Sequence, residues 1–195
     1  VGFALLVALC AQIAIRIPTT TVPITGQTFG VLLTGGVLGS RRGGLSMMLY
    51  MLLGVAAVPV FAPGGAFLDG KLVHFILPWN GNDGLIWDMA SGGYIVGFVL
   101  AAYVVGLLAE RGWDRRLIKL TLAMLVGNAC VYLIGLPWLA AHIYAKDSLH
   151  SYYQSIYPGA GLLEVTLKGG LFPFIGGDLL KLISAEMVLP GAWML

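Results

Sequence analysis

Two charged residues, Asp178 and Lys181, stand in the middle of an apolar stretch that runs from residue 172 to residue 189. They are three residues apart, so a helix would place them on one face. A charged side chain at the centre of a bilayer costs about 2.5–3.5 kcal/mol on insertion scales, so such groups face the protein interior, pair with each other or serve a function. The two residues are therefore either a structural ion pair or the polar end of a ligand pocket. Gly176 and Gly177 precede them and leave room for a ligand to approach the backbone.

A second polar position, Asn128, lies in the apolar stretch 120–141 and shares a helical stripe with Tyr132 and Gly135. An amide offers a donor and an acceptor together, which suits a urea or carboxamide group of a ligand. The alternative is a hydrogen bond between two helices. Near the end of the same stretch, Trp138 suits a pocket wall or the aromatic belt at a membrane interface.

The segment RIPTTTVPITGQTFGVLLTGG, residues 16–36, reads as an irregular loop followed by a helix. Pro18 and Pro23 prevent a regular helix in its first part. Thr25, Gln27 and Thr28 supply polar groups where the helix begins. The loop either closes over a ligand or is a plain connector, with Thr28 as the N-cap of the helix.

Nothing in the chain matches a familiar catalytic or metal site. Gly65, Gly70 and Lys71 approach a phosphate-binding loop, but Leu72 stands where a Ser or Thr should bind Mg²⁺. The histidines stand in predicted loops at no metal-ligand spacing: His74, His142 and His150. We therefore expect no catalytic residue, no metal and no cofactor, and a membrane hydrolase would need an unfamiliar arrangement.

The composition is that of a membrane protein. Hydrophobic residues make up 58% of the 195 residues, charged residues 10%, and the mean hydropathy is +0.90. Soluble domains have about 25% charged residues, so this chain needs a lipid bilayer around most of its surface. A net charge of +2 gives no reason to expect nucleic acid. Cys10 and Cys130 both lie in apolar segments, which favours small core residues over a disulfide.

Six apolar segments predict an all-α fold of six transmembrane helices in one domain, residues 1–195. They cover residues 2–15, 28–38, 45–62, 92–109, 120–141 and 162–190. A spanning helix needs about 20 residues. The first segment can itself span, so no cleavable signal peptide is needed. Because the chain starts at Val1 without a Met, part of the first helix is expected to precede this numbering.

The basic residues predict the orientation. Six of the eleven lie in two of the turns, and the other loops hold few: Arg41 and Arg42 in one turn, and Arg111, Arg115, Arg116 and Lys119 in the other. The positive-inside rule predicts that both turns lie on the cytoplasmic side of the cell membrane. Because the number of helices is even, both termini are predicted to lie on that side too. The long loops 63–91 and 142–161 then face outward. Their aromatic residues are either interface anchors or a lid over a site: Trp79, Trp87, Tyr144, Tyr152, Tyr153 and Tyr157.

Small residues recur four apart, as Ala4 and Ala8 and as Gly93 and Gly97. This spacing lets helices approach closely in lipid. It fits packing within the chain or docking to a partner.

Five blocks of sequence together resemble the BioY family, the biotin-binding S components of energy-coupling factor (ECF) transporters. In order they are VPITGQTFGVLLTGGVLGSRRGG, LYMLLGVAAVPVFAPGG, SGGYIVGF, YLIGLPWL and GGDLLK. The resemblance implies an S-component bundle of six transmembrane helices that binds biotin from outside with high affinity. It also implies docking to a transmembrane coupling protein and two ABC-type ATPases, which supply the energy.

The same resemblance assigns roles to single residues. Asp178 and Lys181 of GGDLLK are implied to contact biotin. Gln27 and Thr28 resemble the family's first-loop lid, and Tyr94 and Trp138 are implied pocket walls. The residues implied to dock to the coupling protein lie on the first helix: Ala4 and Ala8. Two outer loops, 66–90 and 142–161, are longer than the family pattern leads us to expect.

Residues and resemblance together give three hypotheses. The first is a biotin-binding S component in which Asp178 accepts a ureido N–H, while Lys181 donates to the polar head or pairs with Asp178. Asn128 is a further candidate contact. The second is the same architecture for another small vitamin, and the third is a membrane enzyme of unknown reaction.

Overall fold

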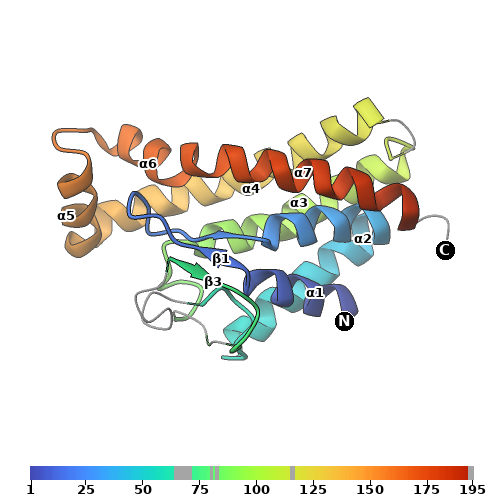
Figure 1. Ribbon diagram of the computed structural model, residues 1–195, viewed down its shortest axis with the longest axis horizontal. Coiled ribbons are helices and arrows are strands. Elements are labelled where there is room, and N and C mark those ends of the chain that lie inside the picture. Colours follow the sequence, from blue (N-terminus) through green and yellow to red (C-terminus); the bar gives the residue numbers. More distant parts are fainter. Residues whose placement is uncertain (64–71, 80, 82–83, 115–116, 193–195) are drawn as a thin grey trace.

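The computed structural model describes residues 1–63, 72–79, 81, 84–114 and 117–192. Most of them are helical (Figure 1). The elements in chain order are α1 (Gly2–Ala11), β1 (Ala14–Ile15), β2 (Ile24–Thr25), α2 (Gln27–Val55), β3 (Val73–His74), α3 (Gly92–Glu110), α4 (Leu117–Ala145), α5 (Asp147–Ile156), α6 (Leu162–Gly170) and α7 (Phe172–Ala192). The near match to a phosphate-binding loop at Gly65, Gly70 and Lys71, and the basic residues Arg115 and Arg116, lie outside the described residues.

Helix α2 joins the second and third predicted helices across a sharp kink. Gly39 at the kink has φ 77° and ψ −178°, a backbone conformation that only glycine adopts readily. Glu110 of α3 caps the second arm, because its Oε1 accepts from the backbone N and the Oγ of Ser40 at 2.7 and 2.9 Å. The prediction of a turn between residues 38 and 45 is therefore wrong after Gly39, because the chain is helical again from Ser40. The second arm ends at Val55, short of the predicted end at residue 62.

The last predicted helix, 162–190, is two helices. The chain breaks at Leu171, which separates α6 from α7. A further helix, α5, occupies most of the predicted outer loop 142–161, and α4 runs on to Ala145. The apolar residues of α5 have the spacing of an amphipathic helix, a signal that the prediction of a loop overlooked: Leu149, Tyr152, Tyr153 and Ile156.

A small antiparallel sheet corrects the all-α prediction. Its strand order is β2-β1-β3, with Ala14 paired to Thr25 on one side and to His74 on the other. Strands of two residues are too short to show an alternating pattern, so they could not be predicted from hydrophobic periodicity. They tie the first loop to the segment that follows α2.

Close packing at glycines assembles the centre of the bundle, where α3 packs between α2 and α4. A Cβ atom at Gly93 would lie 2.2 Å from Trp138 Cβ, and one at Gly97 would lie 2.9 Å from Val131 Cα. The spacing of Gly93 and Gly97 therefore serves packing within the chain. Cys10 and Cys130 are both free, as the sequence predicted.

The ends of the bundle differ. In Figure 1 the start of α1 and the end of α7 lie at one end, and α5 lies at the other. Among the described residues, two stretches are long and apolar enough to span a bilayer. They are Gly92–Glu110, with a mean hydropathy of 2.0, and Ile118–Ala145, with 1.8. The α1 helix is apolar but shorter.

Candidate functional site

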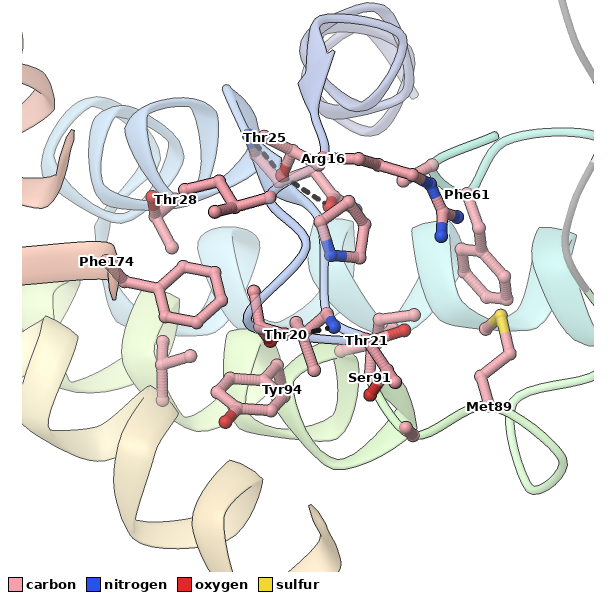
Figure 2. Close-up of a pocket in the computed structure, with 18 of the residues that line it drawn as sticks. Arg16, Thr20, Thr21, Thr25, Thr28, Phe61, Met89, Ser91, Tyr94 and Phe174 are labelled. Atoms are coloured by element: carbon pink, nitrogen blue, oxygen red, sulfur yellow. Dashed lines mark hydrogen bonds between the residues drawn. The ribbon is translucent and has the colours of Figure 1, made fainter. Parts of the chain in front are cut away.

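A cavity of about 630 Å³ lies between the first loop and the helices α2, α3, α4 and α7. This volume falls within the range of about 300–1,000 Å³ that is usual for small-molecule sites. Figure 2 shows the rings of Phe174 and Tyr94 on one side of it. Phe61, Met89 and the guanidinium group of Arg16 lie on another. The lining includes five of the residues predicted from the sequence: Gln27, Thr28, Tyr94, Asp178 and Lys181.

The Asp178 carboxylate is the acceptor at one end of the cavity. It is buried, and its Oδ1 accepts from Lys181 Nζ at 3.0 Å and from Thr28 Oγ1 at 3.4 Å. Its Oδ2 accepts from the Tyr132 hydroxyl of α4. Three helices thus fix the carboxylate, and the predicted pairing of Asp178 with Lys181 is present. The pair also lines the cavity, so the ion-pair and pocket interpretations hold together.

Gln27 belongs to a buried hydrogen-bond chain at the start of α2. Its Oε1 accepts from Thr25 Oγ1 at 2.7 Å, and its Nε2 donates to the Tyr50 hydroxyl at 2.7 Å. The Tyr50 hydroxyl in turn donates to the Val60 carbonyl. Because α2 begins at Gln27, after Gly26 at the N-cap, the N-cap alternative for Thr28 is wrong.

An aromatic wall covers the α3 side of the cavity. The Tyr94 ring centroid lies 6.4 Å from that of Phe174 and 6.1 Å from that of Tyr132, the latter pair edge-to-face. The Tyr94 hydroxyl donates to the Gly170 carbonyl at 2.9 Å. That bond uses the polar end of Tyr94, so the ring presents an apolar surface to the cavity.

Arg16 is a lining residue that the sequence reasoning missed. It directly follows β1, and its backbone N donates to the Leu72 carbonyl at 2.7 Å. Its Nη2 donates to the Pro63 carbonyl at 3.1 Å, and the side chain reaches the cavity wall. The sequence did contain a signal for this residue. Arg16 is positively charged and stands in a loop predicted to face outward, whereas the positive-inside rule concentrates basic residues in cytoplasmic loops.

Three tyrosines that follow α4 hold the first loop over the cavity. The Tyr153 hydroxyl is hydrogen-bonded to the backbone N and Oγ1 of Thr21 at 3.2 and 2.9 Å. Two further bonds join the same elements: Tyr152 to the Pro18 carbonyl at 2.8 Å and Tyr157 to the Thr19 carbonyl at 3.3 Å. Burial raises the pKa of Tyr152, which keeps its phenol a hydrogen-bond donor. In this arrangement the three tyrosines bind the first loop, a contact that the lid interpretation of the outer aromatic residues requires.

The first loop is also tied to the end of α6. Thr20 Oγ1 donates to the Gly169 carbonyl at 2.5 Å. A Cβ atom at Gly169 would lie 2.5 Å from the Tyr153 ring, so the loop, α5 and α6 meet closely at this point.

Two of the predicted pocket residues lie outside the cavity lining. Trp138 packs behind the α3 side, where its Nε1 donates to the Met89 carbonyl at 3.1 Å and its ring stacks on that of His142. It therefore supports Met89, which does line the cavity. Asn128 lines a separate groove between α4 and α7. The sequence placed Asn128 and Tyr132 on one stripe, but only the helix packing shows that Tyr132 alone reaches the cavity.

The two alanines predicted to dock a partner lie in the core. Ala4 and Ala8 are 0% and 1% exposed, whereas the outer face of α1 presents Leu5 and Leu9. The described part of the chain contains no cluster of three or more His, Cys, Asp or Glu residues that could hold a metal.

Comparison with known proteins accounts for this combination of bundle, loop and cavity. The model of the BioY family matches residues 1–195, the whole of the sequence. The chain belongs to the BioY family. The resemblance seen in the five sequence blocks is thereby confirmed.

Several BioY relatives are similar over most of their length. One is the probable biotin transporter BioY of Pyrococcus horikoshii, 32% identical over 186 residues, which covers 95% of this chain and 88% of the relative. Another is the biotin transporter BioY of Thermotoga maritima, 31% identical over 174 residues, covering 89% and 82%.

A solved structure has a similar fold. The crystal structure of the S component for biotin from an ECF-type ABC transporter matches with a TM-score of 0.68. The match covers 96% of this chain and 85% of that one, at 22% sequence identity. The predicted S-component-like bundle is therefore observed as a fold.

Proposed function

We propose that this BioY chain is the substrate-binding S component of an ECF-type transporter, and that its substrate is biotin. The observation that supports this most directly is the cavity, whose lining includes a fixed carboxylate, a guanidinium group and aromatic rings. Biotin has matching parts: a ureido ring with two N–H donors, an apolar thioether ring and a carboxylate on a short chain. The chain binds and releases this ligand unchanged, and no chemical step is required of it.

The polar end of the cavity suits the ureido ring. Asp178 accepts hydrogen bonds only, so a ligand N–H is the partner that it can take. Lys181 lies beside it and donates to Asp178 Oδ1 or to the ureido oxygen. Thr28, which already donates to Asp178, and Gln27 complete the α2 side of this end.

The guanidinium group of Arg16 suits the carboxylate of biotin. Arginine presents several N–H donors in a planar fork that matches a carboxylate. Between the two ends, Tyr94 and Phe174 offer apolar faces to the thioether ring. Trp138 contributes to binding by holding the Met89 backbone in place.

The lid over this cavity is the first loop, fixed in the closed position by α5. A cavity whose walls are ordered before the ligand arrives lowers the entropy lost on binding, which favours high affinity for a small molecule. Opening requires the tyrosine contacts with the loop to break.

Transport requires partners, namely an ECF transmembrane coupling protein and two ABC-type ATPases. We propose a single six-helix domain in the cell membrane with both termini in the cytoplasm, because the basic turns favour that orientation. The start of α1 and the end of α7 lie at the same end of the bundle in Figure 1, which is consistent with an even number of spans.

Docking through α1 remains part of the proposal. In this conformation Ala4 and Ala8 pack inside the bundle, so Trp at either position would overpack the core and lower stability. Trp in place of Leu5 and Leu9 tests the exposed face without that effect. Loss of biotin uptake with intact binding supports docking there, and the same change at Leu180 and Ile183, which are exposed on α7, is the control.

The proposed substrate is tested by calorimetry on the purified chain in detergent. Biotin is compared with desthiobiotin, which keeps the ureido ring, with biotin amide, which lacks the carboxylate charge, and with thiamine. Tight one-to-one binding of biotin, with none of thiamine, is the expected result. Folded protein that binds thiamine but not biotin would indicate another vitamin, and turnover of any ligand would indicate an enzyme.

A further inference from the structure

A second hollow lies on the other side of the Asp178 carboxylate. It is a groove of about 490 Å³ between α4 and α7, lined almost entirely by apolar side chains. Tyr132 and Asp178 line both this groove and the ligand cavity. The hydrogen bond from the Tyr132 hydroxyl to Asp178 Oδ2 therefore lies between the two spaces.

The polar group that distinguishes this groove is the side chain of Asn128. It is only 8% exposed, and its Oδ1 receives no hydrogen bond from any described residue. A buried carbonyl oxygen without a donor is destabilising, and native proteins contain few of them. We therefore expect Asn128 Oδ1 to accept a hydrogen bond in another conformation of the protein.

Tyr132 is the donor best placed to supply it. It stands four residues after Asn128 on α4, on the same helix face. Side chains on a helix lean toward its N-terminus, so the phenol of Tyr132 extends over the turn that contains Asn128. Its single O–H is bonded to Asp178. Among the lining residues of the groove, Tyr132 is thus a hydroxyl donor that another group could release.

We infer that binding of a ligand N–H to Asp178 releases the Tyr132 hydroxyl, which then donates to Asn128 Oδ1. This inference rests on the proposed function, because it requires a ligand with an N–H donor such as the ureido group. Before the exchange, Asp178 accepts from Tyr132 and Asn128 has no donor. After it, Asp178 accepts from the ligand and Asn128 accepts from Tyr132, so no buried group loses a partner and one gains a partner.

Asn128 is therefore a positioning residue that acts through Tyr132 and does not touch the ligand. The exchange also turns the phenol away from the carboxylate, which makes room for the ligand at that end of the cavity. Lys181 and Thr28 keep their bonds to Oδ1 throughout.

A double-mutant cycle with Asn128→Leu and Tyr132→Phe tests this exchange. Leucine has nearly the shape of asparagine and removes the orphaned oxygen. We expect Asn128→Leu to weaken biotin binding about 10-fold, since the released phenol then lacks an acceptor. In the Tyr132→Phe background the same change should have no further effect. The ligand-free Asn128→Leu chain should melt at the wild-type temperature or above it.

Three results would overturn the inference. The first is unchanged biotin affinity in Asn128→Leu. The second is an equal loss in both backgrounds, which would make Asn128 a direct contact. The third is a lower melting temperature of the ligand-free variant, which would mean that Asn128 already makes a structural hydrogen bond.

The design separates this inference from the proposed function. Wild-type protein that is folded but binds no biotin refutes the proposed function and the inference with it. Wild-type binding with any of the three results above refutes the exchange alone. If Tyr132→Phe does not fold, the affinity and ligand-free stability of Asn128→Leu still decide.

Discussion

The two polar positions of the cavity are built in different ways. Asp178 is carried by α7 and fixed by side chains from α2, α4 and α7 itself. Arg16 is carried by a loop, fixed by backbone contacts to Leu72 and Pro63, while α5 and α6 hold the rest of that loop. The helix-borne group is held by side chains of three packed helices, whereas the loop-borne group depends on contacts that opening of the loop would break.

This difference assigns the two positions to different tasks. Helices anchored in a packed bundle hold a group to within a few tenths of an ångström, which suits recognition of a small ring. Loops open and close more readily because fewer buried contacts hold them. We therefore expect changes near Asp178 to alter affinity most, and changes in the contacts between the loop and α5 to alter rates most.

The largest effect is expected from Asp178→Asn. The substitution removes the charge-assisted acceptor and leaves the partly buried Lys181 ammonium without its counter-charge. Biotin Kd measured by calorimetry should rise about 100-fold, since each lost charge-assisted bond costs roughly 1.5–3 kcal/mol. Glu164→Gln is the matched control, because Glu164 also pairs with a lysine but on an exposed helix face. Unaltered affinity in Asp178→Asn would refute its role.

Arg16→Gln should have the next largest effect and should depend on the ligand. Biotin affinity is expected to fall about 10-fold, while affinity for biotin amide stays close to the wild-type value, because only biotin carries the charge that Arg16 pairs with. Arg41→Gln, on an exposed residue of α2 away from the cavity, controls for the change in net charge. An equal loss for both ligands would mean that Arg16 shapes the loop and does not read the carboxylate.

Tyr153→Phe should act on rates more than on affinity. It removes the hydroxyl that bonds to the backbone N and Oγ1 of Thr21, so the loop opens more often. Stopped-flow measurements should show dissociation about 5-fold faster, with faster association as well, as expected from the loss of about 1 kcal/mol in a hydrogen bond. Tyr144→Phe, at an exposed tyrosine of α4, should leave both rates alone. A slower association rate would contradict the lid assignment.

Thr28→Val should have the smallest effect. The Thr28 hydroxyl lies 3.4 Å from Asp178 Oδ1, near the limit for a hydrogen bond, and valine keeps the shape of the side chain. Biotin Kd is expected to change about 2-fold at most. Thr34→Val, whose hydroxyl bonds to the Gly30 carbonyl within α2, gives the corresponding control. A 10-fold loss in Thr28→Val would show that Thr28 touches the ligand itself.

Much of the helical fold follows from local sequence. Apolar stretches predicted α1, α3 and α4 close to their observed positions, because hydropathy and length are properties of the segment alone. The kink at Gly39 and the break at Leu171 did not follow, and α5 was missed although its apolar residues have helical spacing. The helical arm after Gly39 depends on another element, because Glu110 of α3 caps it.

The residues of the site also differ in whether the sequence alone could predict them. Asp178 and Lys181 were readable because charges in an apolar helix are costly and a three-residue spacing fixes their common face. Arg16, in contrast, stands in a loop whose path is set by pairing with segments about 10 and 60 residues away, so its approach to the cavity is a property of the folded chain.

The sequence by itself determined a chain suited to lipid, with helical segments, two charged residues on one helix face and a BioY pattern, because these depend on composition and short spacing. Only the tertiary structure decided that Tyr132 lines the cavity. It also decided that four other candidate residues do not: Asn128, Trp138, Ala4 and Ala8. A helix stripe is about 100° wide and has two edges, and which of these faces a cavity depends on the neighbouring helix. Here that neighbour is α7, which packs against α4 so that a single tyrosine lines both the cavity and the groove.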